Sequence, residues 1–95
     1  MNEEYKLITK LEALESMIKN GEKMIVQIKN QITASEVMDR IGKRLILKGD
    51  KYASKVGENQ TKLVNLRMNL RHLEEMQDYL LDLRPDIVAE SKAKA

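Results

Sequence analysis

Two runs of apolar residues, spaced alternately three and four positions apart, constrain this chain more than any other feature of its sequence. The first run comprises Leu7, Leu11, Leu14, Ile18, Gly21, Ile25, Ile28 and Ile32, and the second comprises Val56, Asn59, Leu63, Leu66, Leu70, Leu73, Gln77 and Leu80. This spacing is typical of the contact line of a coiled coil, which is narrower than the apolar face of a globular helix. The sequence therefore predicts two long α-helices that pack along these two lines, here called the seams.

The chain divides into two helices, a connection and a C-terminal segment. Gly42 and Gly49 bound the connection, and Arg84-Pro85 predicts the end of the second helix because a residue before proline avoids the helical region. The first helix, the connection, the second helix and a short or frayed C-terminal segment are predicted at residues 3–40, 41–51, 52–83 and 85–95.

Two seams of similar length on either side of a glycine-bounded elbow favour an antiparallel hairpin. Pairing residues whose numbers sum to 91 brings every seam position opposite another, for example Gly21 opposite Leu70. A shift of seven residues satisfies the same period but leaves one helix end overhanging. The predicted fold is thus a single all-α domain, an antiparallel two-helix coiled-coil hairpin, whose connection is a helix, a loop or a short β-hairpin.

Apolar residues also lie beside the seams. We expect five of them to mediate self-association: Met17, Met24, Met38, Met76 and Leu83. A chain of 95 residues has few other ways to bury them, and the simplest assembly is a twofold four-helix bundle. The same methionines would also suit an adaptable surface for another protein, because thioether side chains repack easily. The first expectation is a homodimer.

The formal net charge of +2 conceals an uneven distribution. Residues 1–39 carry five bases and seven acids, residues 40–62 carry seven bases and two acids, and residues 63–95 carry five bases and six acids. Six basic residues cluster in or near the connection: Arg40, Lys43, Arg44, Lys48, Lys51 and Lys55. Such a cluster can bind nucleic acid, nucleotide or another polyanion through phosphate contacts, or it can simply keep the connection soluble. Tyr52 is the only aromatic residue nearby, which disfavours stacking on single strands.

The sequence contains no pattern typical of an enzyme. It has no Cys, and its glycines do not form a phosphate-binding loop, so we predict neither catalysis nor a cofactor. The only histidine, His72, lies three residues before Glu75, but two ligands make an incomplete metal site. We interpret His72 as an exposed residue of the second helix and expect no metal.

No apolar run approaches the roughly 18–20 residues of a membrane span. The N-terminal residues Met1-Asn2-Glu3-Glu4 are acidic, whereas a signal peptide begins with basic residues. We therefore expect a cytoplasmic protein that does not contact membranes.

One segment resembles a known family. The run Glu36-Val37-Met38-Asp39-Arg40-Ile41-Gly42-Lys43-Arg44-Leu45-Ile46-Leu47, followed by a heptad helix, is similar to the hairpin segment of prefoldin beta-type subunits. In that family a small β-hairpin joins two coiled-coil helices. The resemblance implies an oligomeric holding chaperone that works without ATP and holds unfolded clients at the helix tips. The helices here are shorter, and Met38 stands where the family usually has an aromatic residue.

Taken together, these patterns predict a non-enzymatic factor for protein–protein interaction or assembly, of the adaptor, regulator or holding-chaperone type. The alternative is a protein that binds a polyanion through residues 40–55.

Overall fold

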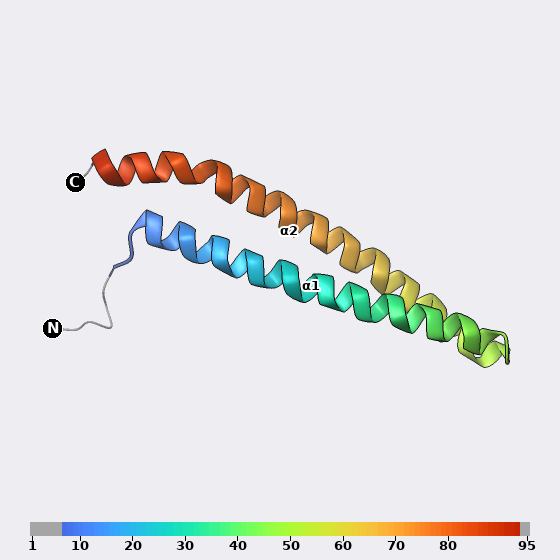
Figure 1. Ribbon diagram of the computed structural model, residues 1–95. Helices are drawn as coiled ribbons and strands as arrows, with labels where there is room; N and C mark the ends of the chain where they lie inside the picture. Colours follow the sequence, from blue (N-terminus) through green and yellow to red (C-terminus); the bar gives the residue numbers. More distant parts are fainter. Residues whose placement is uncertain (1–6, 94–95) are drawn as a thin grey trace.

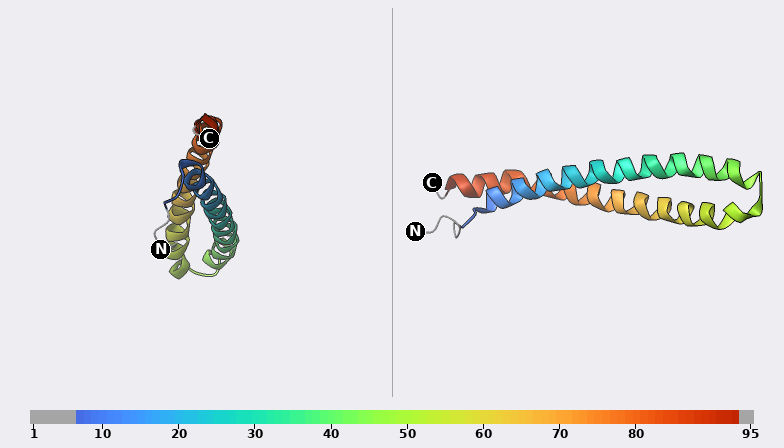
Figure 2. Two further views of the ribbon diagram at one scale, coloured as in Figure 1. Left: turned by 90° about the vertical axis from the view of Figure 1, so that its left-hand side faces the viewer. Right: turned by 90° about the horizontal axis from the view of Figure 1, so that it is seen from below.

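The computed structural model describes residues 7–93, which form a hairpin of two long helices with both chain ends at the same end of a rod (Figure 1). Helix α1 spans Lys10–Ile46, the short 3₁₀-helix η2 spans Asp50–Tyr52, and helix α2 spans Ala53–Ala93. The rod measures 69 × 32 × 14 Å, and the two helices cross as they run along it (Figure 2). The predicted all-α helical hairpin is confirmed, and residues 7–93 contain no β-strand.

Helix α1 begins at a capping box. The hydroxyl oxygen of Thr9 accepts a hydrogen bond from the amide of Glu12 at 3.1 Å, and the Glu12 carboxylate accepts one from the Thr9 amide at 3.2 Å. These two bonds satisfy backbone donors that a helix N-terminus otherwise leaves unpaired. The first helix was predicted to begin at about residue 3, but Leu7–Thr9 precede it and are not helical. Residues 3–6 lie outside the described part of the chain.

The elbow is shorter than the connection predicted at residues 41–51. Helix α1 continues to Ile46, and the amides of Lys48 and Gly49 then bond to the carbonyls of Leu45 and Ile46 at 2.9 and 3.1 Å. These bonds tighten the last turn of the helix before η2 begins. The β-hairpin that was one of the alternatives for this region is not present, because residues 41–46 are helical and keep the period of the first seam.

Helix α2 does not end before Pro85 but continues to Ala93, so the predicted boundary at residue 83 is wrong. Proline inside a helix removes one hydrogen bond and costs about 3 kcal/mol. The residues that follow it recover part of this cost, because Ile87 and Val88 are half-buried. The C-terminal part of α2 bends relative to the rest, as a proline within a helix would cause (Figure 1). Of the predicted C-terminal segment, residues 85–93 are helical, and residues 94–95 lie outside the described part.

The helices pair one heptad away from the predicted register. A Cβ atom placed on Gly21 would collide with the side chain of Gln77, and one placed on Gly42 would collide with Val56. Both pairs have residue numbers that sum to 98, whereas the predicted pairs sum to 91. The longer α2 accounts for the difference, because in this register residues 85–88 lie opposite the first turn of α1 at residues 10–13.

Two amide side chains on the second seam favour the observed register. Gln77 donates a hydrogen bond to the carbonyl of Ile18, and Asn59 donates one to the carbonyl of Ser35, both at 2.8 Å. Gln77 lies opposite Gly21, whose lack of a side chain leaves room for the amide to reach the facing backbone. Polar seam residues often fix coiled-coil register in this way, because a shift would leave their groups buried and unpaired. The buried apolar residues of the described chain are Leu14, Val56, Leu63, Leu66 and Leu80.

Candidate functional site

The two sides of the hairpin differ in chemistry, and the register shows which residues share a side. On one side an ion pair joins Arg67 of α2 to Glu36 of α1 at 3.3 Å. Residues seven apart lie on the same side of a coiled-coil helix, so the positions equivalent to these two form a line on each helix. The resulting charged flank comprises Glu15, Glu22, Lys29, Glu36 and Lys43 of α1, with Gln60, Arg67, Glu74, Leu81 and Val88 of α2.

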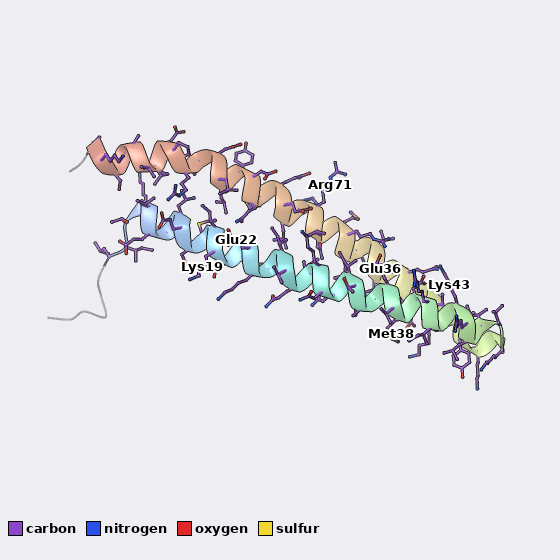
Figure 3. All side chains as sticks on the ribbon, viewed as in Figure 1. Lys19, Glu22, Glu36, Met38, Lys43 and Arg71 are labelled. Carbon is purple, nitrogen blue, oxygen red and sulfur yellow. The ribbon has the colours of Figure 1, made fainter. Side chains whose placement is uncertain are left out.

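The opposite side carries the methionines. On α1 it comprises Ala13, Met17, Asn20, Met24, Gln27, Gln31, Ala34, Met38, Ile41 and Leu45, and on α2 it comprises Asn65, Asn69, His72, Met76, Tyr79 and Leu83. We call these residues the methionine face. The ten residues on α1 include no Asp, Glu, Lys or Arg, although α1 carries ten such residues between positions 13 and 45. On α2 the same side continues into charged residues beyond this uncharged stretch, with Lys55, Glu58 and Lys62 towards the elbow and Asp86 and Glu90 towards the open end. Met38 and the acidic Glu36 emerge on opposite sides of α1 (Figure 3).

All five residues predicted to mediate self-association belong to this methionine face. They are exposed by 45–58%, with Leu83 lowest and Met38 highest. Their own chain therefore leaves about half of each side chain open to solvent. Sequence reasoning missed Ile41 and Tyr79, which are 47% and 78% exposed on the same face. Assigning each residue to a helix face, rather than to a segment, would have found them.

At the elbow the methionine face contains a small hollow of about 210 Å³. Its walls are almost entirely apolar and come from the end of α1 and the start of α2: Met38, Ile41, Gly42, Leu45, Tyr52, Lys55, Val56 and Asn59. Gly42 allows the hollow to form, because it brings α1 close to Val56 without a side chain of its own. The hollow can accept an apolar side chain from another molecule beside the Lys55 ammonium group.

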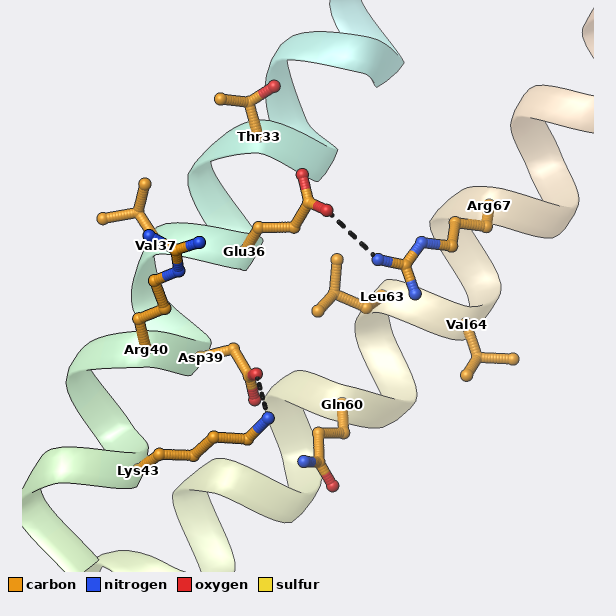
Figure 4. A pocket seen from close by; sticks show the side chains of 10 residues that line it. All are labelled: Thr33, Glu36, Val37, Asp39, Arg40, Lys43, Gln60, Leu63, Val64 and Arg67. Atoms are coloured by element: carbon orange, nitrogen blue, oxygen red, sulfur yellow. Dashed lines mark hydrogen bonds and ion pairs between the residues drawn. The ribbon is translucent and has the colours of Figure 1, made fainter.

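The charged flank contains a larger polar groove of about 650 Å³ (Figure 4). Lys43 bonds to Asp39 at 2.9 Å on one wall, and Arg67 bonds to Glu36 across the groove. Asp39 occupies a seam position, and its Oδ1 atom is buried with no hydrogen-bond partner in residues 7–93. The groove therefore combines two acids and three bases, counting Arg40, and has no strong preference for one sign of charge.

Asp39 gives the fold a measurable dependence on pH. The hydrogen bond from Lys43 lowers the pKa of the Asp39 carboxyl below its usual value, while desolvation acts in the opposite direction. Because the pKa is lower in the folded state, Asp39 stabilises the fold above its unfolded pKa, and this contribution is lost as the pH falls through the folded pKa. Acid titration followed by circular dichroism should therefore show a smaller loss of stability below about pH 4, the ordinary pKa of aspartate, in Asp39→Asn than in the wild type.

The control for this titration is Asp82→Asn, which removes an exposed carboxylate on the outer face of α2. It should retain the acid sensitivity of the wild type. If Asp39→Asn were equally sensitive, the contact with Lys43 would not contribute to stability.

The basic residues of the elbow are all exposed, but the structure does not gather them on one face. Arg40 and Lys43 line the polar groove, whereas Lys55 lines the hollow on the opposite side. The Lys51 ammonium lies 5.1 Å from the centre of the Tyr52 ring. Together with Arg44 and Lys48, they surround the tip of the rod.

In residues 7–93, no group of three His, Asp or Glu side chains is arranged to hold a metal ion. His72 is exposed, and the neighbouring Glu75 carboxylate accepts a hydrogen bond from Arg71 at 3.3 Å.

Within the described residues, neither helix contains a stretch that is both long and apolar enough to cross a bilayer.

Comparisons of the chain with protein-family models, with curated proteins and with solved structures find no match.

Proposed function

We propose that this protein is a non-enzymatic assembly factor that acts as a homo-oligomer, with the methionine face as its assembly surface. The observation that carries the proposal is a face that has no charged residue along α1 from Ala13 to Leu45 or along α2 from Asn65 to Leu83 and keeps its methionines about half exposed. Apolar surface removed from water contributes about 25 cal/mol per Å². Covering this face therefore supplies a driving force for association that the charged flank lacks.

The small core of the isolated hairpin supports the same proposal. Its buried apolar side chains are Leu14, Val56, Leu63, Leu66 and Leu80, all on the seams. Chains of this size usually need further burial, through oligomerisation for example, to become stable. Methionine suits such an interface, because its flexible thioether fills irregular gaps.

Sedimentation velocity across micromolar concentrations tests the proposal. The wild type should sediment as a dimer or larger species, and Met24→Glu should weaken association by about tenfold or more, equivalent to 1.4 kcal/mol. The matched control is Val26→Glu, which places the same charge at an apolar residue that is 56% exposed but lies outside the methionine face. A wild-type chain that stays monomeric throughout this range would refute self-association, as would equal weakening by both variants.

A holding chaperone, implied by the prefoldin resemblance, is a narrower form of this proposal. The supporting feature is exposed apolar surface that could shield unfolded chains, including Leu7 and Ile8 near the open end, which are 90% and 69% exposed. The test is suppression of the aggregation of a denatured client without ATP. Failure to suppress aggregation would remove this form and leave the assembly role untouched.

Polyanion binding at the elbow is the second candidate. It is favoured by the six exposed cations that surround one tip of the rod. Binding of DNA, RNA or nucleotides should weaken steeply as salt rises, because phosphate contacts release counterions. Replacement of Lys43, Arg44, Lys48 and Lys51 by Glu should abolish it. No binding at low salt, or binding unchanged by these substitutions, would refute this candidate.

A further inference from the structure

The hairpin separates charge along its length. Its open end, formed by residues 7–22 and 74–93, carries nine acids and four bases, whereas the elbow at residues 40–62 carries two acids and seven bases. The formal charges of these two ends are therefore −5 and +5. They lie at opposite ends of a rod 69 Å long (Figure 1). This separation of charge arises from folding, because the acidic end forms only when residues 7–22 and 74–93 lie side by side.

Two copies can stack through their methionine faces about a twofold axis in two ways. A parallel stack places the two elbows together and lays α1 of one copy over α2 of the other. An antiparallel stack places each elbow beside the open end of the other copy and lays α1 over α1. Like charges in the parallel stack repel within the Debye length of about 10 Å, whereas opposite charges meet in the antiparallel stack.

The sequence of α1 also fits an antiparallel contact with itself. Its face without charge runs from Ala13 to Leu45, so its centre lies near position 29. About that centre, residues whose numbers sum to 58 face each other. In three of the five pairs a large residue meets a smaller one: Met24 with Ala34, Met38 with Asn20, and Leu45 with Ala13. The other two pairs are Met17 with Ile41 and Gln27 with Gln31. Interfaces favour such interdigitation because it reaches the packing density of a protein core.

Other registers of the same stack are worse. A shift of seven residues in one direction brings Lys10 opposite Ile41, and a shift in the other direction brings Lys48 opposite Met17. Each shift therefore places a charged residue of α1 opposite an apolar residue of the other α1, which the register centred near position 29 avoids on this helix. Only the register centred near position 29 pairs all ten positions of this face on α1.

The contact is large enough for a stable dimer. The face covers 32 residue steps on α1, or about 48 Å, and 18 steps on α2, or about 27 Å, and each helix is roughly 10 Å wide. It therefore offers on the order of 750 Å² per copy, close to the roughly 800 Å² per partner of a standard protein interface.

From these observations we infer that the occupant of the methionine face is a second copy of this chain, stacked antiparallel with the two α1 helices in contact near position 29. The inference rests on the proposed self-association and adds its orientation and register. The acidic open end of the second copy would then neutralise the basic elbow. The basic residues of the elbow would thus contribute to the contact between the two copies.

Disulfide cross-linking tests the orientation directly, because the chain has no cysteine of its own. Oxidation of a mixture of Met24→Cys and Ala34→Cys chains should yield a cross-linked heterodimer. A mixture of Met24→Cys and Met76→Cys should not, because these positions approach each other between copies only in the parallel stack. Val26→Cys alone, outside the methionine face, should remain uncross-linked and serves as the background. Circular dichroism of each variant checks that the helices are retained.

A distance measurement provides a second, independent readout. Spin labels attached at Lys48→Cys should lie about 57 Å apart in the antiparallel dimer. Residue 48 is 19 residues from the twofold axis in each copy, and a helix rises about 1.5 Å per residue. Adjacent elbows in a parallel dimer would instead give a short distance. A short distance, or cross-linking of Met24→Cys with Met76→Cys, would overturn the antiparallel stack while leaving self-association intact. A monomer in sedimentation would overturn both.

Discussion

Replacing Leu63 by alanine is expected to reduce the free energy of unfolding by about 2–3 kcal/mol, the lower part of the usual range for leucine truncation in a core. Leu63 is 5% exposed and lies on the second seam, opposite the buried Ser35. The small serine cannot fill the space that the leucine leaves. The loss stays in the lower part of the range because Leu63 also lines the polar groove, where water can enter the cavity.

Val64 provides the matched control, because it is the next residue along α2 but is 55% exposed. Val64→Ala should change stability by less than about 0.5 kcal/mol, as is usual for surface positions. Urea unfolding followed by circular dichroism measures both, at one total concentration because a dimer gains stability with concentration. Similar losses for the two variants would mean that α2 is rotated about its axis relative to the seam described above.

The fold could be predicted from the sequence because one physical rule governs nearly the whole chain. Residues three and four apart share a helix face, and two such faces separated by a short elbow have few alternatives to a hairpin. The register could not be obtained from the same rule, because a seven-residue repeat fits equally well after any shift of seven. The amides of Gln77 and Asn59 distinguish between registers, but only once the facing backbone is known.

Pro85 shows how a local rule can fail. Proline usually ends a helix, and this led to a predicted boundary at residue 83. In the structure, the half-buried Ile87 and Val88 make continuation favourable. This error also affected the predicted register. With a second helix that ends at residue 83, the observed register would leave the start of the first helix overhanging.

The candidate site was partly accessible from the sequence. The exposed methionines follow from their positions beside the seams. The absence of charge on one face of α1 from Ala13 to Leu45 is equally visible in the sequence, but counting charges by segment concealed it. The polar groove and the hollow at the elbow could not be predicted, because both combine residues of α1 and α2 that only the observed register brings together.

The register itself leads to the second large expected effect, at Gly42. Replacing it by leucine should destabilise the hairpin by about 2–3 kcal/mol, since even a Cβ atom there would lie 2.6 Å from the Cγ2 atom of Val56. Val56 is buried and β-branched, so it cannot turn away easily. Gly57→Ala is the control, because a Cβ atom there meets nothing within 4 Å. It should stabilise α2 by up to about 1 kcal/mol through helix propensity.

A double-mutant cycle then separates the two registers. If Gly42 faces Val56, the double variant Gly42→Leu/Val56→Ala should recover about 1–2 kcal/mol relative to the sum of the single changes, because the leucine fills the space that the valine leaves. In the register whose numbers sum to 91, Gly42 would face Gly49 in the elbow, and the two substitutions would be additive. Additivity in urea unfolding would therefore contradict the observed register, and with it the facing of α1 and α2 on which the methionine face depends.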